Sequence, residues 1–184
     1  MTIWNTPERE ALRSAVEAFT RAEIVPNLPQ WEDDGELPRT LHKAIADAGL
    51  LAVGFDESVG GDGGTIVDAM VVTEAMLAAG GSSGLQASLF THGISTPHIV
   101  DSGDQYLIDR YVRPTLAGEK IGSLGVTEPG GGSDVAGITT RAVRDGDHYV
   151  VNGAKTFITS GVRADFVTTA VRTGGEGHAG ISLL

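Results

Sequence analysis

The spacing of apolar residues changes near residue 118, and this change restricts the possible folds more than any other feature of the sequence. Before Gly118, apolar residues recur every three or four positions, which is typical of one face of an α-helix. After Gly118, short apolar runs alternate with turn residues, which is typical of β-strands. The sequence therefore predicts an α+β fold, with an all-helical domain over residues 1–118 and an incomplete antiparallel β-domain over residues 119–184.

Start and stop signals divide the helical part into six predicted helices. Thr6, Pro7 and Glu8 supply a cap, a proline at the first helical position and an acid in the first turn. Ser83 and Gln86 are spaced as a capping box for the fourth helix. Four residues of the third helix are expected to face inward: Val67, Met70, Val71 and Ala78. The helices are expected over residues 6–26, 38–49, 65–79, 83–90, 96–101 and 104–116.

Strand signals follow in the second part. Residues 143–149 indicate a hairpin on an Asp-Gly turn, and Asn152 with Gly153 predicts a second hairpin turn. Residues 166–172 and 181–184 are expected to form two further strands. Because the chain stops inside an apolar strand, we expect it to be a piece of a longer protein.

The composition argues against several classes of partner and site. A formal net charge of -11 disfavours nucleic acids and anionic membrane surfaces. No cysteine is present, so disulfide and thiolate chemistry are excluded. The first five residues lack the features of a signal peptide and no apolar run has the length of a membrane span, so we expect a cytoplasmic protein. The histidines lack metal-ligand spacing, and most of them are expected at the surface or at helix caps. Glu74 is expected in a structural role, and residues 32–34 are expected in a solvated loop.

The glycine-rich stretch at residues 126–134 is the first candidate for a binding site. Pro129 precedes three consecutive glycines, and short polar side chains lie on both sides of them. Successive backbone N–H groups in such a turn can bind an anion, although a plain glycine-rich β-turn is the simpler interpretation. Neither residues 60–64 nor residues 153–156 match a nucleotide-binding glycine loop in spacing and context.

A second stretch, residues 152–161, changes the interpretation of the first. Together the stretches resemble the acyl-CoA dehydrogenase family of flavoproteins, which carries TEP-x-[AG]-G-S-D followed by NG-x-K-x-[WFY]-I-T-[NS]-G. They read TEPGGGSD at residues 127–134 and NGAKTFITSG at residues 152–161. The resemblance extends over nearly the whole chain, with local departures at Asp56 and Val59, where the family often has proline and tyrosine.

The resemblance implies FAD as cofactor and an acyl-CoA as substrate. Thr127 and Thr159 would present polar groups to the edge of the flavin ring, and Phe157 would lie against one of its faces. Ser133 would approach the pyrophosphate, together with Gly132, and would also contact the CoA portion of the substrate. The residues expected to contact the flavin are Leu124, Gly125, Val126, Thr127, Gly132, Ser133, Phe157, Ile158 and Thr159.

The resemblance also implies a reaction, the α,β-dehydrogenation of an acyl-CoA thioester to the enoyl-CoA. The catalytic glutamate of the family belongs to a C-terminal helical domain, which would lie beyond residue 184, so no catalytic residue is expected among residues 1–184. An electron-transfer flavoprotein is the expected type of electron acceptor, and the full-length protein is expected to be a homo-oligomer. Two alternatives remain, a flavin monooxygenase or oxidase with the same fold and a non-catalytic module.

The resemblance further implies how this chain behaves alone. In the family the flavin also contacts the C-terminal domain and a neighbouring subunit, so the 184-residue chain is expected to bind FAD weakly and to turn over no substrate. Since the family forms tetramers through its C-terminal helices, the chain is not expected to form that tetramer. It can instead associate through its open sheet edge.

Overall fold

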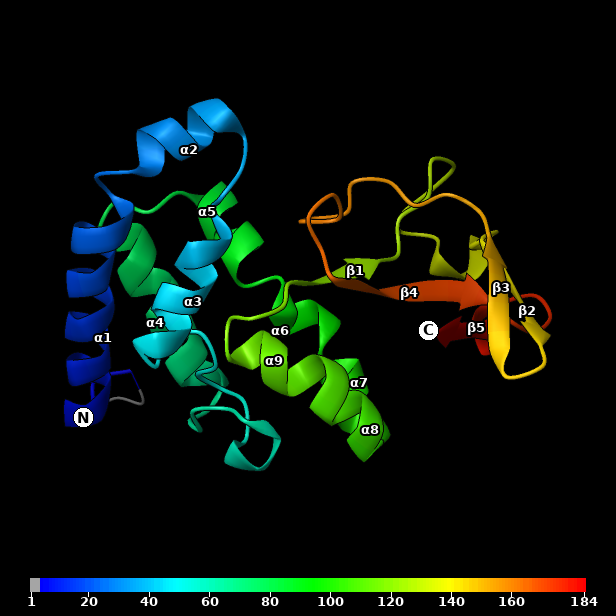
Figure 1. Cartoon of the computed structure of the whole chain (residues 1–184), viewed down its shortest axis with the longest axis horizontal. Helices are drawn as coiled ribbons and strands as arrows, with labels where there is room; N and C mark the ends of the chain where they lie inside the picture. Colours follow the sequence, from blue (N-terminus) through cyan, green and yellow to red (C-terminus); the bar gives the residue numbers. More distant parts are fainter. Residues whose placement is uncertain (1–3) are drawn as a thin grey trace.

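The computed structural model describes residues 4–184 and separates into a helical part and a sheet, joined near residue 120 (Figure 1). Residues 1–3, the first residues of the predicted helical domain, lie outside the described residues. The α-helices are α1 (Pro7–Phe19), α2 (Leu28–Asp34), α3 (Arg39–Asp47), α4 (Ile66–Ala78), α5 (Ser83–Leu89), α6 (His92–Ser95), α7 (Pro97–Ser102), α8 (Gln105–Leu107) and α9 (Arg113–Leu116). Two π-helical turns, Thr20–Ile24 and Ile108–Val112, extend α1 and join α8 to α9.

Capping side chains set the starts of the longest helices. The Arg9 backbone N–H donates to the Thr6 hydroxyl at 3.3 Å, as the sequence predicts for the start of α1. Asp68 accepts from the Thr65 backbone N–H at 2.7 Å and completes a capping box on α4. The predicted box on the fourth helix is wrong by one position, because α5 is capped by Ser82.

The helices enclose one main apolar core. Its fully buried members come from α1, α3, α4 and α5 and the turns beside them, and include Val16, Ile24, Leu41, Ile45, Leu51, Val72, Met76, Leu85 and Leu89. The predicted inner face of the third helix is partly wrong. Val71 is buried, but Met70 is half exposed and Met76 takes an inner position. The reason is that α4 is apolar on most of its circumference, so periodicity alone does not define which side is covered.

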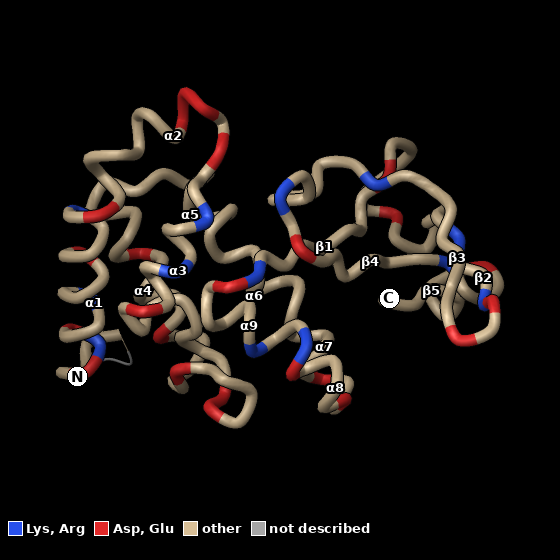
Figure 2. The backbone as a smooth tube through the Cα atoms, in the orientation of Figure 1, with Lys and Arg blue, Asp and Glu red and all other residues tan. Residues whose placement is uncertain are grey.

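Helix α2 includes residues that the sequence analysis expected in a loop, so this prediction is wrong. Residues 32–34, expected in a loop, form its last turn, and Gly35 ends it at a φ of 68°. Leu28 and Trp31 of this helix pack against the main core, and this three-residue spacing is the helical signal that the acidic run obscured. Figure 2 shows the acidic residues gathered at this end of α2.

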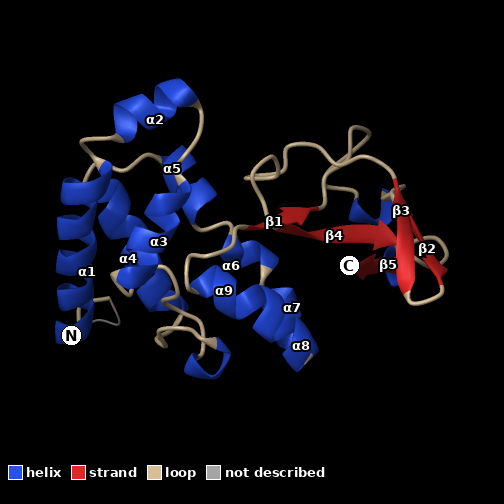
Figure 3. Cartoon of the chain, viewed as in Figure 1, coloured by secondary structure: helices blue, strands red, loops and turns tan. Residues whose placement is uncertain are grey.

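The sheet contains β1 (Gly122–Gly125), β2 (Arg141–Asp145), β3 (His148–Asn152), β4 (Phe166–Arg172) and β5 (Ile181–Leu183). It is mixed, which corrects the expectation of antiparallel strands alone. Pairs β2–β3 and β4–β5 are antiparallel, whereas β1 and β4 run parallel with Gly122 opposite Phe166. β1 and β4 both begin beside the helical part and extend away from it (Figure 3), and alternation of apolar residues does not distinguish the two kinds of pairing.

The Asp-Gly hairpin is confirmed, but the second predicted hairpin turn is wrong. Gly146 lies in the turn between β2 and β3 at a φ of 63°. Gly153 does not start a new hairpin, and the chain continues from it through residues 154–165 to β4. A Cβ at Gly153 would lie 2.4 Å from the Thr140 hydroxyl oxygen. Glycine is therefore required here because two backbones approach closely.

Several contacts join the helical part to the sheet. The carboxylate of Asp165 accepts from Arg39 of α3 and, at 2.7 Å, from the Ile121 backbone N–H. The Thr168 hydroxyl of β4 donates to the Ser95 carbonyl of α6 at 2.8 Å. These bonds hold the starts of β1 and β4 against the helices, and the loops that leave these strands are therefore placed relative to both parts.

Candidate functional site

The two motif stretches, far apart in sequence, lie side by side. We call residues 126–134 the glycine segment and residues 155–161 the threonine segment. The glycine segment leaves the end of β1, and the threonine segment precedes β4, the parallel neighbour of β1. The Thr156 backbone N–H donates to the Thr127 carbonyl at 2.9 Å, and the Lys155 ammonium donates to the Val126 carbonyl at 2.8 Å. The structure thus brings together the residues that the sequence assigned to one site.

The glycine segment begins with a tight turn. Glu128 and Gly131 exchange two backbone hydrogen bonds, of 2.9 and 3.1 Å, around Pro129 and Gly130. The three glycines adopt ordinary backbone conformations, and a Cβ at Gly130 or Gly131 would meet no atom within 4 Å. Neither the backbone nor the packing of this chain requires glycine at these two positions. Open backbone without side chains is what close approach by a ligand requires.

Four hydroxyl groups in the two segments have no hydrogen-bond partner within the protein. Among residues 4–184, the hydroxyls of Thr127, Ser133, Thr156 and Thr159 make no hydrogen bond to another residue. Gly132 packs against Thr127, since a Cβ there would lie 3.3 Å from the Thr127 methyl carbon. Thr127 is half-buried, and Ser133 and Thr159 are exposed.

Phe157 combines a highly exposed aromatic side chain with an unusual backbone conformation. Its side chain is 91% exposed, and its φ of 56° lies in the left-handed region that aromatic residues avoid. Ser160 has a similar φ of 59°. An exposed aromatic ring in a strained backbone suggests a function, since neither burial nor conformation explains it.

The threonine segment is also anchored at the residues that follow Phe157. The Ser123 hydroxyl of β1 donates to the Thr159 carbonyl. The hydroxyls of Ser160 and Ser88, on α5, lie 3.2 Å apart in a hydrogen bond. Ile158 is half-buried beneath the segment. The conformation of the segment is therefore set by β1 and α5 together.

Leu124 and Gly125 lie within β1, where they pair with Thr168 and Thr169 of β4. A Cβ at Gly125 would meet the Val167 side chain at 3.2 Å, so glycine allows close packing of these strands. These two residues therefore belong to the sheet from which the glycine segment leaves.

An ion pair that the motifs did not predict joins the two segments. Glu128 and Lys155 lie 2.9 Å apart, with side chains only 8% and 11% exposed. Burial alone would raise the pKa of Glu128, but hydrogen bonds from Thr139 and Thr140 outweigh burial and hold this pKa far below its usual range. The sequence signal for this ion pair was a glutamate in the first motif and a lysine in the second.

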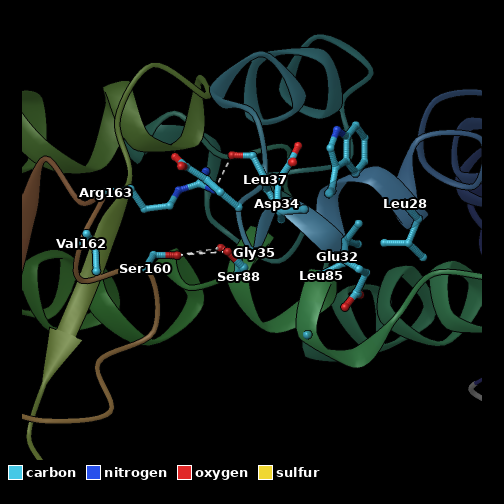
Figure 4. A pocket seen from close by; sticks show the side chains of 13 residues that line it. Leu28, Glu32, Asp34, Gly35, Leu37, Leu85, Ser88, Ser160, Val162 and Arg163 are labelled. Atoms are coloured by element: carbon cyan, nitrogen blue, oxygen red, sulfur yellow. Dashed lines mark hydrogen bonds between the residues drawn. The ribbon is translucent and has the colours of Figure 1, made fainter.

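A groove continues from the threonine segment along the helical part (Figure 4). It has a volume of about 500 Å³, and α2, α5 and residues 160–163 form its walls. Its apolar lining includes Trp31, Leu85 and Val162. Arg163 crosses one end and donates to the Leu37 carbonyl at 2.5 Å.

Other sequence expectations have mixed outcomes. Glu74 accepts from Arg13 at 2.9 Å on an exposed surface, as expected. His42 and His92 are buried, which corrects their expected surface location. Burial, together with Arg163 near His42, lowers the pKa of each to about 4. Over the described residues, no group of acids and histidines could hold a metal ion, and no helix is long and apolar enough to cross a membrane.

Comparisons with known proteins agree with the geometry. Residues 6–119 match the family model described as acyl-CoA dehydrogenase, N-terminal domain, and residues 123–184 match the acyl-CoA dehydrogenase, middle domain. A probable acyl-CoA dehydrogenase from Mycobacterium abscessus is 66% identical, with a TM-score of 0.97 over 98% of this chain and 48% of its own.

More distant relatives show the same pattern. The long-chain specific acyl-CoA dehydrogenase of Sus scrofa mitochondria is 35% identical over 96% of this chain and 41% of its own length. A glutaryl-CoA dehydrogenase from Mycobacterium smegmatis, solved in complex with FADH2, is 28% identical with a TM-score of 0.86, over 97% of this chain and 45% of its own. The chain thus spans somewhat less than half the length of these relatives. It belongs to the acyl-CoA dehydrogenase family.

Proposed function

We propose that this chain is the part of an FAD-dependent acyl-CoA dehydrogenase that supplies the helical domain, residues 1–118, and the first portion of the flavin-binding β-domain, residues 119–184. The whole enzyme would convert an acyl-CoA thioester to the enoyl-CoA. The observation that carries the proposal is the contact between the two motif segments, in which Thr156 donates to the Thr127 carbonyl at 2.9 Å.

The residues at this contact fit a flavin. Phe157 offers an exposed aromatic face of the kind that stacks on a planar ring. The hydroxyls of Thr127 and Thr159, unused by residues 4–184, suit the polar edge of such a ring. The open backbone at Gly130 and Gly131 allows a bulky anionic group to approach.

Each residue then has a distinct task. FAD held by these residues would supply the acceptor for the hydride that leaves the substrate β-carbon. Thr127 and Thr159 orient the ring through their hydroxyl and backbone groups, and Phe157 shields one face from water. Gly132 and Ser133 hold the pyrophosphate, and Ser133 also contacts the CoA portion of the substrate. We assign the base that removes the α-proton to a segment outside these 184 residues.

The proposal extends to partners and location. It includes an acyl-CoA substrate, an electron-transfer flavoprotein as acceptor, a homo-oligomeric full-length protein, and a cytoplasmic location. It also includes the inactivity of the 184-residue chain alone, since the base and much of the flavin contact surface would be missing. Binding must offset a loss of ligand freedom of about 4–15 kcal/mol, and one loop and one strand end supply few contacts for it.

The activity is tested on the longest protein that the gene encodes. It is incubated with acyl-CoA thioesters and an artificial electron acceptor, and enoyl-CoA is measured by mass spectrometry. Phe157→Ala is expected to weaken FAD binding, whereas Tyr106→Ala, at an exposed aromatic residue on α8, leaves it unchanged. Hydrogen peroxide or an oxygenated product in place of enoyl-CoA would contradict the proposal. The 184-residue chain, assayed in parallel, should yield no enoyl-CoA.

A further inference from the structure

The ion pair between Glu128 and Lys155 joins the glycine segment to the threonine segment. The residues are 27 positions apart in sequence, and the Nζ–Oε1 distance is 2.9 Å. Both side chains are nearly covered, unlike a surface pair such as Arg21–Glu17, whose side chains are 62% and 29% exposed. Solvent screening is therefore weak here, and the geometry of the pair is well defined.

The Glu128 carboxylate accepts four hydrogen bonds, and the Lys155 ammonium donates two. Glu128 accepts from the backbone N–H groups of Thr139 and Thr140, both at 2.8 Å, and from the Thr139 hydroxyl at 2.6 Å. Lys155 donates to the Val126 carbonyl at 2.8 Å as well as to Glu128. Glu128 thereby connects the glycine segment, the start of β2 and the threonine segment.

The pair is adjacent in sequence to the groups proposed to contact the flavin. Glu128 follows Thr127, and Lys155 precedes the Thr156 N–H that binds the Thr127 carbonyl. Phe157 is the next residue along the chain. A shift of Lys155 would therefore move Phe157 relative to Thr127.

Stability alone does not explain such a pair. Replacing a buried ion pair by apolar residues is often neutral or stabilising, because desolvation of two charges opposes their attraction. What the pair does supply is one defined separation between the two segments. They are also joined by hydrogen bonds from the Thr156 backbone N–H to the Thr127 carbonyl and from the Lys155 ammonium to the Val126 carbonyl.

We propose that Glu128 and Lys155 are positioning residues, which set the distance between Thr127 and Phe157 and so shape the flavin site without touching the flavin. The proposal rests on the proposed function for the identity of the ligand. The placement of the two segments can be measured without any ligand.

The experiment compares Lys155→Met and Glu128→Gln with the wild-type chain. Arg13→Met is the matched control, because it removes an ion pair of the same 2.9 Å length from the contact between α1 and α4. All proteins are studied at a temperature where circular dichroism shows full folding. Should Lys155→Met fail to fold, Glu128→Gln, which conserves size, carries the test.

The first measurement is amide hydrogen exchange. The Thr156 N–H is expected to exchange at least about tenfold faster in both variants, a change of ~1.4 kcal/mol in local opening. The Thr169 N–H, which donates to the Leu184 carbonyl at 2.7 Å, is expected to keep its rate. Equal acceleration at both amides, or none at Thr156, would overturn the proposal, since the pair would then have a general structural role or none.

The second measurement is the Kd for FAD, from quenching of flavin fluorescence. Both variants are expected to raise this Kd by roughly 2–10-fold while fully folded, and Arg13→Met is expected to leave it unchanged. Variants that bind FAD as the wild type does would overturn the positioning role. A wild-type chain that binds no FAD would instead contradict the proposed function, and hydrogen exchange at Thr156 would still decide whether the pair positions the segments.

Discussion

The substitution Phe157→Asn is expected to stabilise the free chain while weakening its binding of FAD. A left-handed backbone costs an ordinary L-residue about 1–2 kcal/mol, and asparagine adopts it more readily. Phe157 has a φ of 56° and is 91% exposed, so little burial is lost on its replacement. Burying a whole phenylalanine contributes about 1.5–3 kcal/mol, and the covered tenth contributes less than about 0.3 kcal/mol. The net gain is therefore about 1 kcal/mol.

The assay is urea unfolding of the ligand-free chain, supported by thermal unfolding. A gain of about 1 kcal/mol corresponds to a rise in Tm of roughly 2–4 °C for a chain of this length. Phe157→Leu is the matched control, since it keeps the strained backbone and should give no gain. Loss of the aromatic face should raise the Kd for FAD by roughly 2–10-fold in both variants. Equal or lower stability of Phe157→Asn would refute the account of strain at this position.

Two further predictions concern the helical part. Gly118→Ala should lower the free energy of unfolding by more than ~2 kcal/mol, because a Cβ there would lie 2.4 Å from the His42 carbonyl oxygen. Gly103→Ala is the control, since Gly103 has a similar φ and open space around it, and it should lower this free energy by only about 1 kcal/mol. Urea unfolding measures both changes. The pKa values of His42 and His92, lowered from 6.5 to about 4, mean that only the unfolded state gains these protons between pH 6.5 and 4. Stability should therefore fall as the pH drops through this window, by up to ~1.4 kcal/mol per pH unit for each histidine, and His92→Gln should make the dependence shallower.

Local signals predicted most of the helices and strands. The cap at Thr6, the Asp-Gly turn at Gly146 and the strand at residues 166–172 depend on neighbouring residues, and all three are confirmed. Two of the errors arose where distant parts of the chain decide the structure. Gly153 resembles a turn residue in sequence, but the approach of Thr140 determines its role. The parallel pairing of β1 and β4 likewise depends on where both strands meet the helices.

In the candidate site, too, some features follow from local sequence signals and others depend on distant residues. The motifs indicated which residues belong together, and the structure places Thr127 and Phe157 in neighbouring segments. The exposed, left-handed conformation of Phe157 could not be inferred, because it depends on anchors at Ser123 and Ser88 outside the motif. The roles of these residues toward FAD remain predictions.

The most direct test of the central proposal is an NMR titration of the 184-residue chain with FAD. The account predicts weak, saturable shifts of the backbone amides at Thr127, Gly132, Ser133, Phe157 and Thr159, with little change in the amides of α1 and α4. Shifts that fail to saturate, or that fall on the helical part and leave the two motif segments unchanged, would contradict it.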